Sequence, residues 1–263
     1  MSSDEAEDLF QSALSEMWHK SCSEFSNTGL FDQTCTTLTQ ANYNMVKFII
    51  TELGVDKDSK ILDIACGRGK YAIEIGKMTG CRVTGIDLNE ESIKDAGENA
   101  VKEGLEHTLT FYTGDMLDLP KDVKSQTFTH VLALGCGFFV HDKMSDFLSQ
   151  ITACTDSTSR LLLQDWNRTN ETSLDDIKDL LQHWKYVSPL LTTREYKKEL
   201  AKAGFEILQY QNNTEMAKRS CLWVIGVAEG MKSETRIVAA HETIKAAYFD
   251  GRITYNVIVA KRN

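Results

Sequence analysis

Residues 60–69 read KILDIACGRG, and this stretch decides the fold class of the chain. Its apolar residues on both sides of Asp63 are typical of a buried strand, and Gly67 and Gly69 are typical of a tight turn. The apolar periodicity that follows favours a helix. A strand that leads through a glycine-rich turn into a helix suits nucleoside-containing cofactors, because the ligand can approach the bare backbone and the unpaired N–H groups of the helix start.

On both sides of this stretch, the apolar pattern alternates between strand and helix periods. Strands are expected at residues 60–65, 82–87, 109–113, 129–134, 160–166 and 205–210. Helices are expected at residues 69–78, 90–103, 143–152, 173–183 and 193–203. Such alternation predicts an α/β fold with a doubly wound, mostly parallel sheet.

The two ends of the chain depart from simple alternation. Two helices are expected before the first strand, at 9–18 and 38–53, and a helical pattern broken near Gly230 precedes a final strand at 252–260. Helical insertions in this position often form lids over ligand clefts. We therefore expect one domain over residues 1–263, divided into an N-terminal helical cap (1–57), a cofactor-binding core (58–212), a helical lid (213–250) and a last strand (251–263).

Composition excludes several classes of protein. The formal net charge of −9 argues against a nucleic-acid partner, whose phosphates favour basic surfaces. No apolar stretch is long enough to span a membrane, and the acidic start lacks the features of a signal peptide. The 7 cysteines form no C-x-x-C pair, so neither a metal site nor a redox motif is expected. These features predict a cytoplasmic protein with reduced thiols.

Three acidic residues lie at or after the ends of the first three strands. Asp63 precedes the glycine turn, and Asp87 ends the next strand, where such folds place the acid that binds a ribose diol. Asp115 follows the third strand, where a carboxylate can accept a hydrogen bond from an adenine amino group. Ligands bind at this edge of doubly wound sheets. The three acids therefore predict a nucleoside site.

The turn also fits a second kind of cofactor. Residues 67–72 match G-x-G-x-x-A, the dinucleotide fingerprint, so an NAD(P)-dependent oxidoreductase is an alternative. Asp63 would then lie close to the pyrophosphate, and Asp115 would have no role. A dinucleotide domain also usually begins with its first strand, whereas two helices are expected here before it. These points favour a cofactor other than a dinucleotide.

Residues 61–69 closely resemble motif I of the class I S-adenosylmethionine-dependent methyltransferases. The resemblance continues through residues 83–88 and 113–116, and at the level of the fold it covers roughly residues 58–260. It implies a seven-stranded sheet whose last strand is antiparallel. The layout is most similar to small-molecule enzymes of the phosphoethanolamine, sarcosine, coclaurine and tocopherol methyltransferase types, with the cyclopropane-fatty-acid relatives. Their likeness implies transfer of a methyl group from S-adenosylmethionine to a small-molecule acceptor, at N or O, by in-line displacement in a monomer or homodimer. S-adenosylhomocysteine is the implied product.

The resemblance also assigns cofactor-binding positions. The implied residues are Asp63, Ala65, Gly67, Gly69, Leu134 and Gly135 around the methionine part, Asp87 at the ribose, and Leu88, Asp115 and Met116 around the adenine.

His141 is the best single candidate for a catalytic base, because it follows the fourth strand at the cofactor edge of the sheet. A base is needed only if the acceptor holds a proton at the working pH. Many relatives carry a histidine in an H-x-P-D-[KR] run here. This chain reads FVHDK over residues 139–143, with the histidine displaced and the proline absent. A helix-cap neighbour exposed to solvent is the other interpretation of His141.

Candidate acceptor-binding residues come from three parts of the chain. Trp166 and Asn167 end the fifth strand, where they can contact an amine or hydroxyl, and Trp166 can stack on a cation or ring. Tyr43 lies in the cap and His241 in the lid, where core packing is the alternative role. A protein that keeps this fold only as a binding module is the second alternative to an enzyme.

Overall fold

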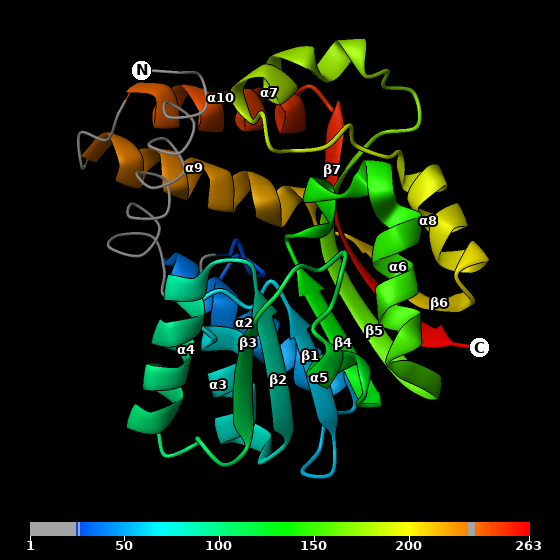
Figure 1. The fold of residues 1–263 in the computed structure, drawn as a ribbon. Coiled ribbons are helices and arrows are strands. Elements are labelled where there is room, and N and C mark those ends of the chain that lie inside the picture. The colour runs from blue at the N-terminus through cyan, green and yellow to red at the C-terminus, as the bar shows by residue number, and fades with distance from the viewer. Residues whose placement is uncertain (1–24, 26, 231–234) are drawn as a thin grey trace.

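The structure is a computed structural model that describes residue 25, residues 27–230 and residues 235–263 (Figure 1). The helix expected at 9–18 lies outside the described residues. The sheet has seven strands in the order β3-β2-β1-β4-β5-β7-β6. They are β1 (Lys60–Ile64), β2 (Arg82–Asp87), β3 (Leu109–Thr113), β4 (Phe128–Leu134), β5 (Thr155–Arg168), β6 (Phe205–Asn212) and β7 (Ile253–Arg262).

Strand β7 runs antiparallel to both of its neighbours, β5 and β6. The pairs β1–β2, β1–β4, β2–β3 and β4–β5 are parallel. The predicted doubly wound sheet with an antiparallel last strand is therefore confirmed.

Helices pack on both faces of the sheet. One face carries α2 (Leu38–Leu53), α3 (Lys70–Thr79) and α4 (Glu90–Lys102), and the other carries α5 (Lys121–Lys124), α6 (Met144–Ala153) and α8 (Thr193–Lys202). Strand residues alternate between the two apolar cores, because successive side chains of a strand point to opposite faces. Ile61 belongs to the core under α2 and α3, and its neighbour Leu62 belongs to the core under α6.

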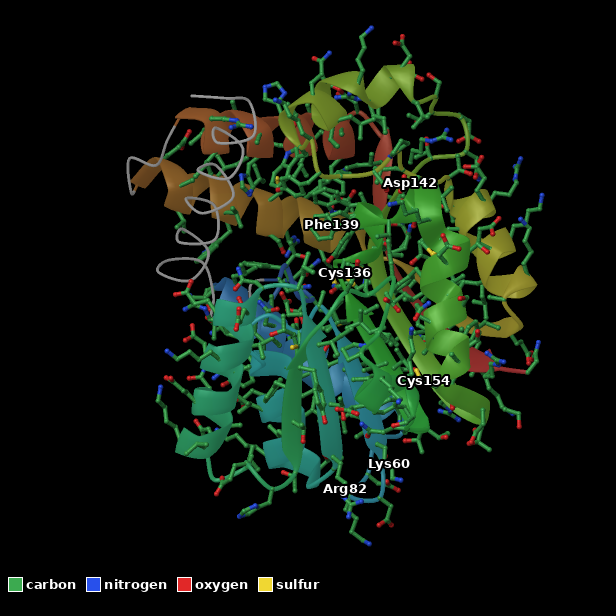
Figure 2. All side chains as sticks on the ribbon, viewed as in Figure 1. Lys60, Arg82, Cys136, Phe139, Asp142 and Cys154 are labelled. Atoms are coloured by element: carbon green, nitrogen blue, oxygen red, sulfur yellow. The ribbon has the colours of Figure 1, made fainter. Side chains whose placement is uncertain are left out.

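A third helical layer lies beyond the carboxyl ends of the parallel strands (Figure 1). It contains α7 (Lys178–His183), α9 (Thr214–Gly230) and α10 (Thr235–Phe249), and the last two pack against each other and against β7. Figure 2 shows Lys60 and Arg82, which start β1 and β2, at the edge of the sheet away from this layer. It shows Cys136 and Phe139 next to the layer. The strands therefore point their carboxyl ends toward α9 and α10.

Two segments differ from the expected helices. The helix expected at 173–183 is a 3₁₀ turn (Asp175–Ile177) followed by α7, because Ile177 leaves helical geometry at φ −116°. The helix expected at 143–152 is preceded by two 3₁₀ turns, Gly137–Phe139 and His141–Lys143. A Cβ on Gly137 would lie 2.1 Å from Oδ2 of Asp165, so only glycine allows this close approach to β5.

Candidate cofactor and acceptor site

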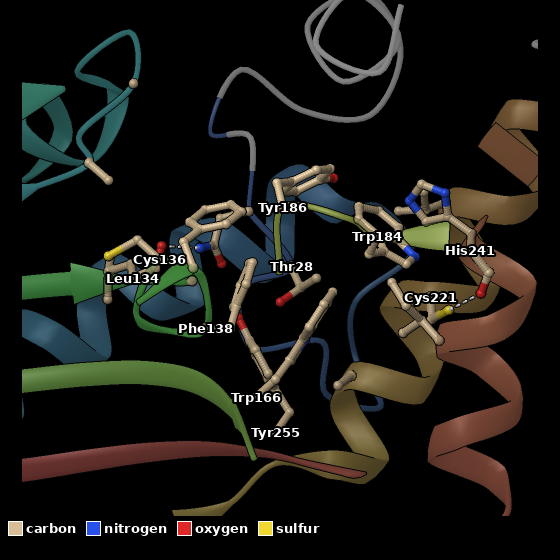
Figure 3. A pocket seen from close by; sticks show the side chains of 18 of the residues that line it. Thr28, Leu134, Cys136, Phe138, Trp166, Trp184, Tyr186, Cys221, His241 and Tyr255 are labelled. Carbon is tan, nitrogen blue, oxygen red and sulfur yellow. Dashed lines mark hydrogen bonds between the residues drawn. The ribbon is translucent and has the colours of Figure 1, made fainter. Parts of the chain in front are cut away.

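A cavity of about 390 Å³ lies between the carboxyl ends of the parallel strands and the layer of α9 and α10 (Figure 3). One end, here called the polar end, is lined by Ala65, Gly67, Asp87, Asn89, Ser92, Leu134 and Gly135. The other, here called the aromatic chamber, is lined mainly by Phe138, Phe139, Trp166, Trp184, Tyr186, His241, Tyr248 and Tyr255. The two ends belong to one continuous space.

The turn after β1 exposes its backbone to the polar end. Gly67 has φ +53°, and a Cβ built on it would meet no atom within 4 Å. Gly69 serves a different purpose, because a Cβ there would lie 2.8 Å from the ring of Phe111. The first glycine therefore keeps space open to a ligand, whereas the second allows the start of α3 to pack closely on β3. Gly69 is not among the cavity-lining residues.

Asp87 organises the polar end through both carboxylate oxygens. Its Oδ2 accepts a hydrogen bond from the Gly67 N–H at 2.9 Å, and its Oδ1 accepts one from the Asn89 N–H at 2.9 Å. Asn89 in turn caps α4, because its Oδ1 accepts from the Ser92 N–H at 2.9 Å. A carboxylate has about four acceptor positions, so Asp87 retains capacity for hydroxyl groups of a ligand.

Asp63 lies beneath the turn, within β1, and is buried. Its Oδ2 has no hydrogen-bond partner among the residues that the structure describes. Burial, with a smaller contribution from the negative charge of Asp87, raises the pKa of Asp63 to about 7. A buried carboxylate oxygen with no protein partner is a group that a cationic ligand would satisfy.

The other predicted cofactor residues divide into two sets. Ala65, Leu134 and Gly135 line the cavity. Leu88, Asp115 and Met116 do not, and Leu88 is 74% exposed. Asp115 is also exposed, and its Oδ1 accepts from the Leu117 N–H at 2.8 Å. Contacts of these three residues with an adenine therefore stay predictions.

The aromatic chamber is built from rings that pack on one another. Phe138 stacks on Trp166 with ring centroids 4.4 Å apart and planes at 15°. Trp184 meets Trp166 edge to face at 5.9 Å and Tyr186 at 5.7 Å. Among the described residues that line the cavity, the only Asp, Glu, Lys or Arg is Asp87, which lies at the polar end. The part of the chamber that these residues form is therefore mainly aromatic and carries no formal charge.

His241 lines the chamber from α10, as the prediction for an acceptor contact requires. Its side chain is buried, and burial lowers its pKa. Burial therefore favours the neutral form of the imidazole. Trp184 lies edge to face with it, at 5.2 Å between ring centroids.

His141 lies outside the cavity lining, buried in a hydrogen-bonded pair with Asp165. Its Nδ1 accepts from the Leu191 N–H at 3.0 Å, so its Nε2 carries the proton and donates to Asp165 Oδ2 at 2.9 Å. Both nitrogens are thus engaged, and the single lone pair of the ring, on Nδ1, is not available to take a proton from a methyl acceptor. This corrects the expectation of a solvent-exposed position, and the geometry gives no support to the predicted role as a base.

Asp165 connects that pair to the chamber wall. Its Oδ1 accepts from the backbone N–H groups of Phe138 at 2.9 Å and Trp166 at 2.8 Å. These are the two residues whose rings stack. The pair of His141 and Asp165 therefore holds the stacked wall in place from behind.

Two predicted acceptor residues do not reach the cavity. Asn167 is completely buried, and its Oδ1 accepts from Asn256 Nδ2 at 2.7 Å, which ties β5 to β7. Tyr43 is 36% exposed and packs edge to face on Phe25 at 5.4 Å. Neither lines the cavity. Trp166, by contrast, lies in the chamber wall.

Sequence reasoning missed other lining residues. Asn27 and Thr28 come from the segment before α2, and Asn27 Nδ2 donates to the carbonyl of Leu134 at 3.1 Å. Trp184 and Tyr186 come from the segment after α7. The aromatic residues between that helix and Pro189 were a usable signal, because large aromatic residues in a connecting segment require an apolar partner.

Residues 55–212 match the family model described as a methyltransferase domain. The chain belongs to this methyltransferase family. The predicted kinship with the class I S-adenosylmethionine-dependent enzymes is thereby confirmed, and the fold agrees with it. The methyltransferase is 24% identical over 245 residues to the 27-O-demethylrifamycin SV methyltransferase of Amycolatopsis mediterranei, covering 92% of this chain and 86% of that one.

The chain is also similar to a second sequence relative and to a solved structure. The sterol 24-C-methyltransferase of Neurospora crassa is 26% identical over 171 residues, which cover 63% of this chain and 44% of that one. The match thus spans less than half the length of this relative. The solved cyclopropane synthase of Mycobacterium tuberculosis has a TM-score of 0.82 at 14% identity, covering 94% of both chains, and this likeness concerns the fold alone.

The described residues contain neither a membrane-spanning helix nor a cluster of metal ligands. None of the helices in this part of the methyltransferase is long and apolar enough to cross a bilayer. Nor do three or more His, Cys, Asp or Glu residues in the described ranges gather where they can bind a metal ion.

Proposed function

We propose that this methyltransferase transfers a methyl group from S-adenosylmethionine to an apolar small molecule that carries neither a phosphate nor a carboxylate group. One observation carries the proposal: a single cavity joins the polar end, which suits the donor, to an uncharged aromatic chamber, which suits the acceptor. N or O is the expected site of methylation. The product derived from the donor is S-adenosylhomocysteine.

The polar end and the carboxylate beneath it have groups that suit the ribose and the methionine part of the donor. Asp87 retains acceptor capacity for the ribose hydroxyls, and Gly67 leaves its backbone open beside it. Asp63 is buried beneath the turn and is not among the described residues that line the cavity, but its unpartnered oxygen suits the ammonium group of the methionine part. Bound S-adenosylmethionine supplies a methyl group on a sulfonium, which is already activated for displacement. The protein then needs mainly to hold the acceptor in line, which can contribute about 7–11 kcal/mol of barrier lowering.

The aromatic chamber restricts the acceptor. A phosphate or carboxylate would find no Lys or Arg among the described residues that line the cavity, and burying it without a cationic partner costs several kcal/mol. This argues against phosphoethanolamine and sarcosine, two of the substrates that the sequence resemblance suggested. The names of the relatives, which place methyl groups on a sterol and on a rifamycin, agree with an apolar acceptor.

Further features of the proposal concern the whole chain. We infer a cytoplasmic monomer or homodimer without a nucleic-acid partner, and the net charge of −9 supports the last point. We also infer that residues 213–250 act as a lid and residues 1–57 as a cap on the core at 58–212. An NAD(P)-dependent oxidoreductase has no support from the family. A binding module that lacks activity is the competing candidate.

Labelled methyl transfer tests the proposal. The protein is incubated with methyl-labelled S-adenosylmethionine and a panel that contains sterols, phenolic polyketides and alkaloid amines beside phosphoethanolamine and sarcosine. We expect label in the apolar group, and much less label with Asp87→Ala when the donor is not saturating. Label only in phosphoethanolamine or sarcosine would contradict the acceptor class. Donor binding without transfer to any compound of the panel or of a metabolite extract would favour the binding module.

A further inference from the structure

We propose that Nε2 of His241 accepts a hydrogen bond from an O–H or N–H group on the acceptor, at the end remote from the methylated atom. The inference rests on the proposed function and narrows the acceptor to an elongated, largely apolar molecule with a hydrogen-bond donor at its distal end. His241 is thereby a specificity-determining residue. No role in the chemical step is assigned to it.

The hydrogen bonds of His241 fix its tautomer. Its Nδ1 lies 2.9 Å from the carbonyl oxygen of Ile237, one turn earlier in α10. A carbonyl oxygen only accepts, so Nδ1 must carry the proton and donate it. In the neutral ring Nε2 therefore keeps a lone pair, and within the described part of the chain no hydrogen-bond donor reaches it. Figure 3 shows the ring of His241 turned toward Trp184 and the cavity.

The position of His241 specifies which part of the acceptor it meets. Figure 3 shows Leu134 at one end of the cavity and His241 at the opposite end, with Trp166 and Tyr255 between them. In the proposed function, Leu134 flanks the donor. The atom that receives the methyl group therefore lies near Leu134, and His241 contacts the far end of the same molecule.

The surroundings of His241 make the contact selective. Trp184 packs against the imidazole, and its Nε1 donates to the carbonyl of Ala240 at 2.8 Å, which ties this wall to α10. His241 is 4% exposed, so little bulk water can replace a missing partner. A site built around a buried polar group discriminates against molecules that lack the matching group, because that polar group is then left unpaired.

Two variants separate recognition from a structural role. In His241→Gln, the amide lies where Nε2 was, so an acceptor still faces the chamber while the bond to Ile237 is lost. In His241→Asn, the amide lies where Nδ1 was, so the bond to Ile237 is kept and the acceptor in the chamber is lost.

The probes are 4-hydroxybiphenyl, which can donate a hydrogen bond, and 4-methoxybiphenyl, which cannot. Both are titrated into the full chain saturated with S-adenosylhomocysteine, with calorimetry as the readout. We expect the wild type and His241→Gln to prefer the hydroxyl probe by about 3- to 10-fold, which corresponds to one neutral hydrogen bond. The preference should fall below about twofold in His241→Asn.

Equal affinities of the wild type for the two probes would overturn the inference. So would a preference that His241→Asn keeps and His241→Gln loses, since that pattern marks a purely structural histidine. Saturation with S-adenosylhomocysteine is measured first and separately. Failure of that step counts against the proposed function, whereas an absent probe preference in saturated protein counts against His241 alone.

Discussion

The polar end and the aromatic chamber are built in opposite ways. Residues of the polar end come from three short stretches of the chain, and a hydrogen bond from the backbone N–H of Gly67 to Asp87 joins two of them. The aromatic chamber is assembled from side chains of distant segments, including Phe138, Trp166 and Trp184. The donor site therefore depends on local backbone geometry, whereas the acceptor site depends on tertiary packing.

The largest expected effect is in the chamber. Trp166→Ala should lower the free energy of unfolding by about 3–5 kcal/mol, because it removes a buried ring that stacks on Phe138. Chemical denaturation measures this loss. Trp166→Phe should keep most of the stability and leave the affinity for S-adenosylmethionine unchanged. A large loss of donor affinity in Trp166→Phe would contradict the claim that the two ends of the cavity bind different ligands.

The next effect is at the polar end. Asp87→Ala should weaken S-adenosylmethionine binding by about 1.5–3 kcal/mol, or roughly 10- to 150-fold, through the loss of a charge-assisted hydrogen bond. The control is Asp118→Ala, which removes an exposed carboxylate paired with Lys124 and should leave the affinity within about twofold. Unchanged affinity in folded Asp87→Ala would refute the ribose assignment.

A third prediction concerns the support of the chamber wall. His141→Ala leaves Asp165 Oδ2 and the Leu191 N–H without their present partners and should cost about 1–3 kcal/mol of stability. Donor affinity should not change. The matched control is His107→Ala, because the His107 side chain is 90% exposed and the expected change is within about 0.5 kcal/mol.

The same variant tests the predicted base role of His141. A positioning role predicts weaker acceptor binding with an unchanged pH profile of turnover. Disappearance of an ionisation from that profile in His141→Ala, with acceptor binding intact, would instead support the base.

The smallest predicted effect is a pH dependence at Asp63, whose pKa burial raises to about 7. Donor affinity should rise about tenfold between pH 6 and pH 8 as the carboxylate forms, and calorimetry at both pH values measures it. Asp63→Asn should bind the donor more weakly and lose this rise. A wild-type affinity that does not change over this range would remove Asp63 from the donor site.

Stability should show the opposite dependence on pH. The folded pKa of Asp63 lies above the unfolded value of about 3.9, so its contribution to the stability of the donor-free protein is lost as pH rises from about 4 to about 7. Asp63→Asn removes this loss. Thermal unfolding at pH 5 and pH 8 should therefore differ less for Asp63→Asn than for the wild type.

The sequence predicts the fold and the polar end well for a physical reason. The turn after β1 is formed by consecutive residues. Its backbone conformation requires glycines, and the acid that ends β2 accepts a hydrogen bond from this turn. The antiparallel β7 was likewise predictable, although only through resemblance to a family. Asn89 and Ser92 were missed as lining residues, because capping a helix explains their residue types equally well.

The chamber was predictable only in part, because its residues meet through tertiary packing. Nothing near His141 in the sequence indicates that the N–H of Leu191, 50 residues later, engages its Nδ1. Asn167 follows Trp166 directly, yet its side chain pairs with Asn256 on β7. The residues around Asn167 in the sequence do not indicate which strand it pairs with. Aromatic residues such as Trp184 indicate that they pack against apolar groups, but the sequence does not identify which residues these are.

Calorimetric titration of S-adenosylmethionine into the full chain tests the central claim most directly. We expect one site per chain, with an affinity that falls roughly 10- to 150-fold in Asp87→Ala and is retained in Trp166→Phe. The absence of binding to folded wild-type protein, or equal losses in both variants, would contradict it.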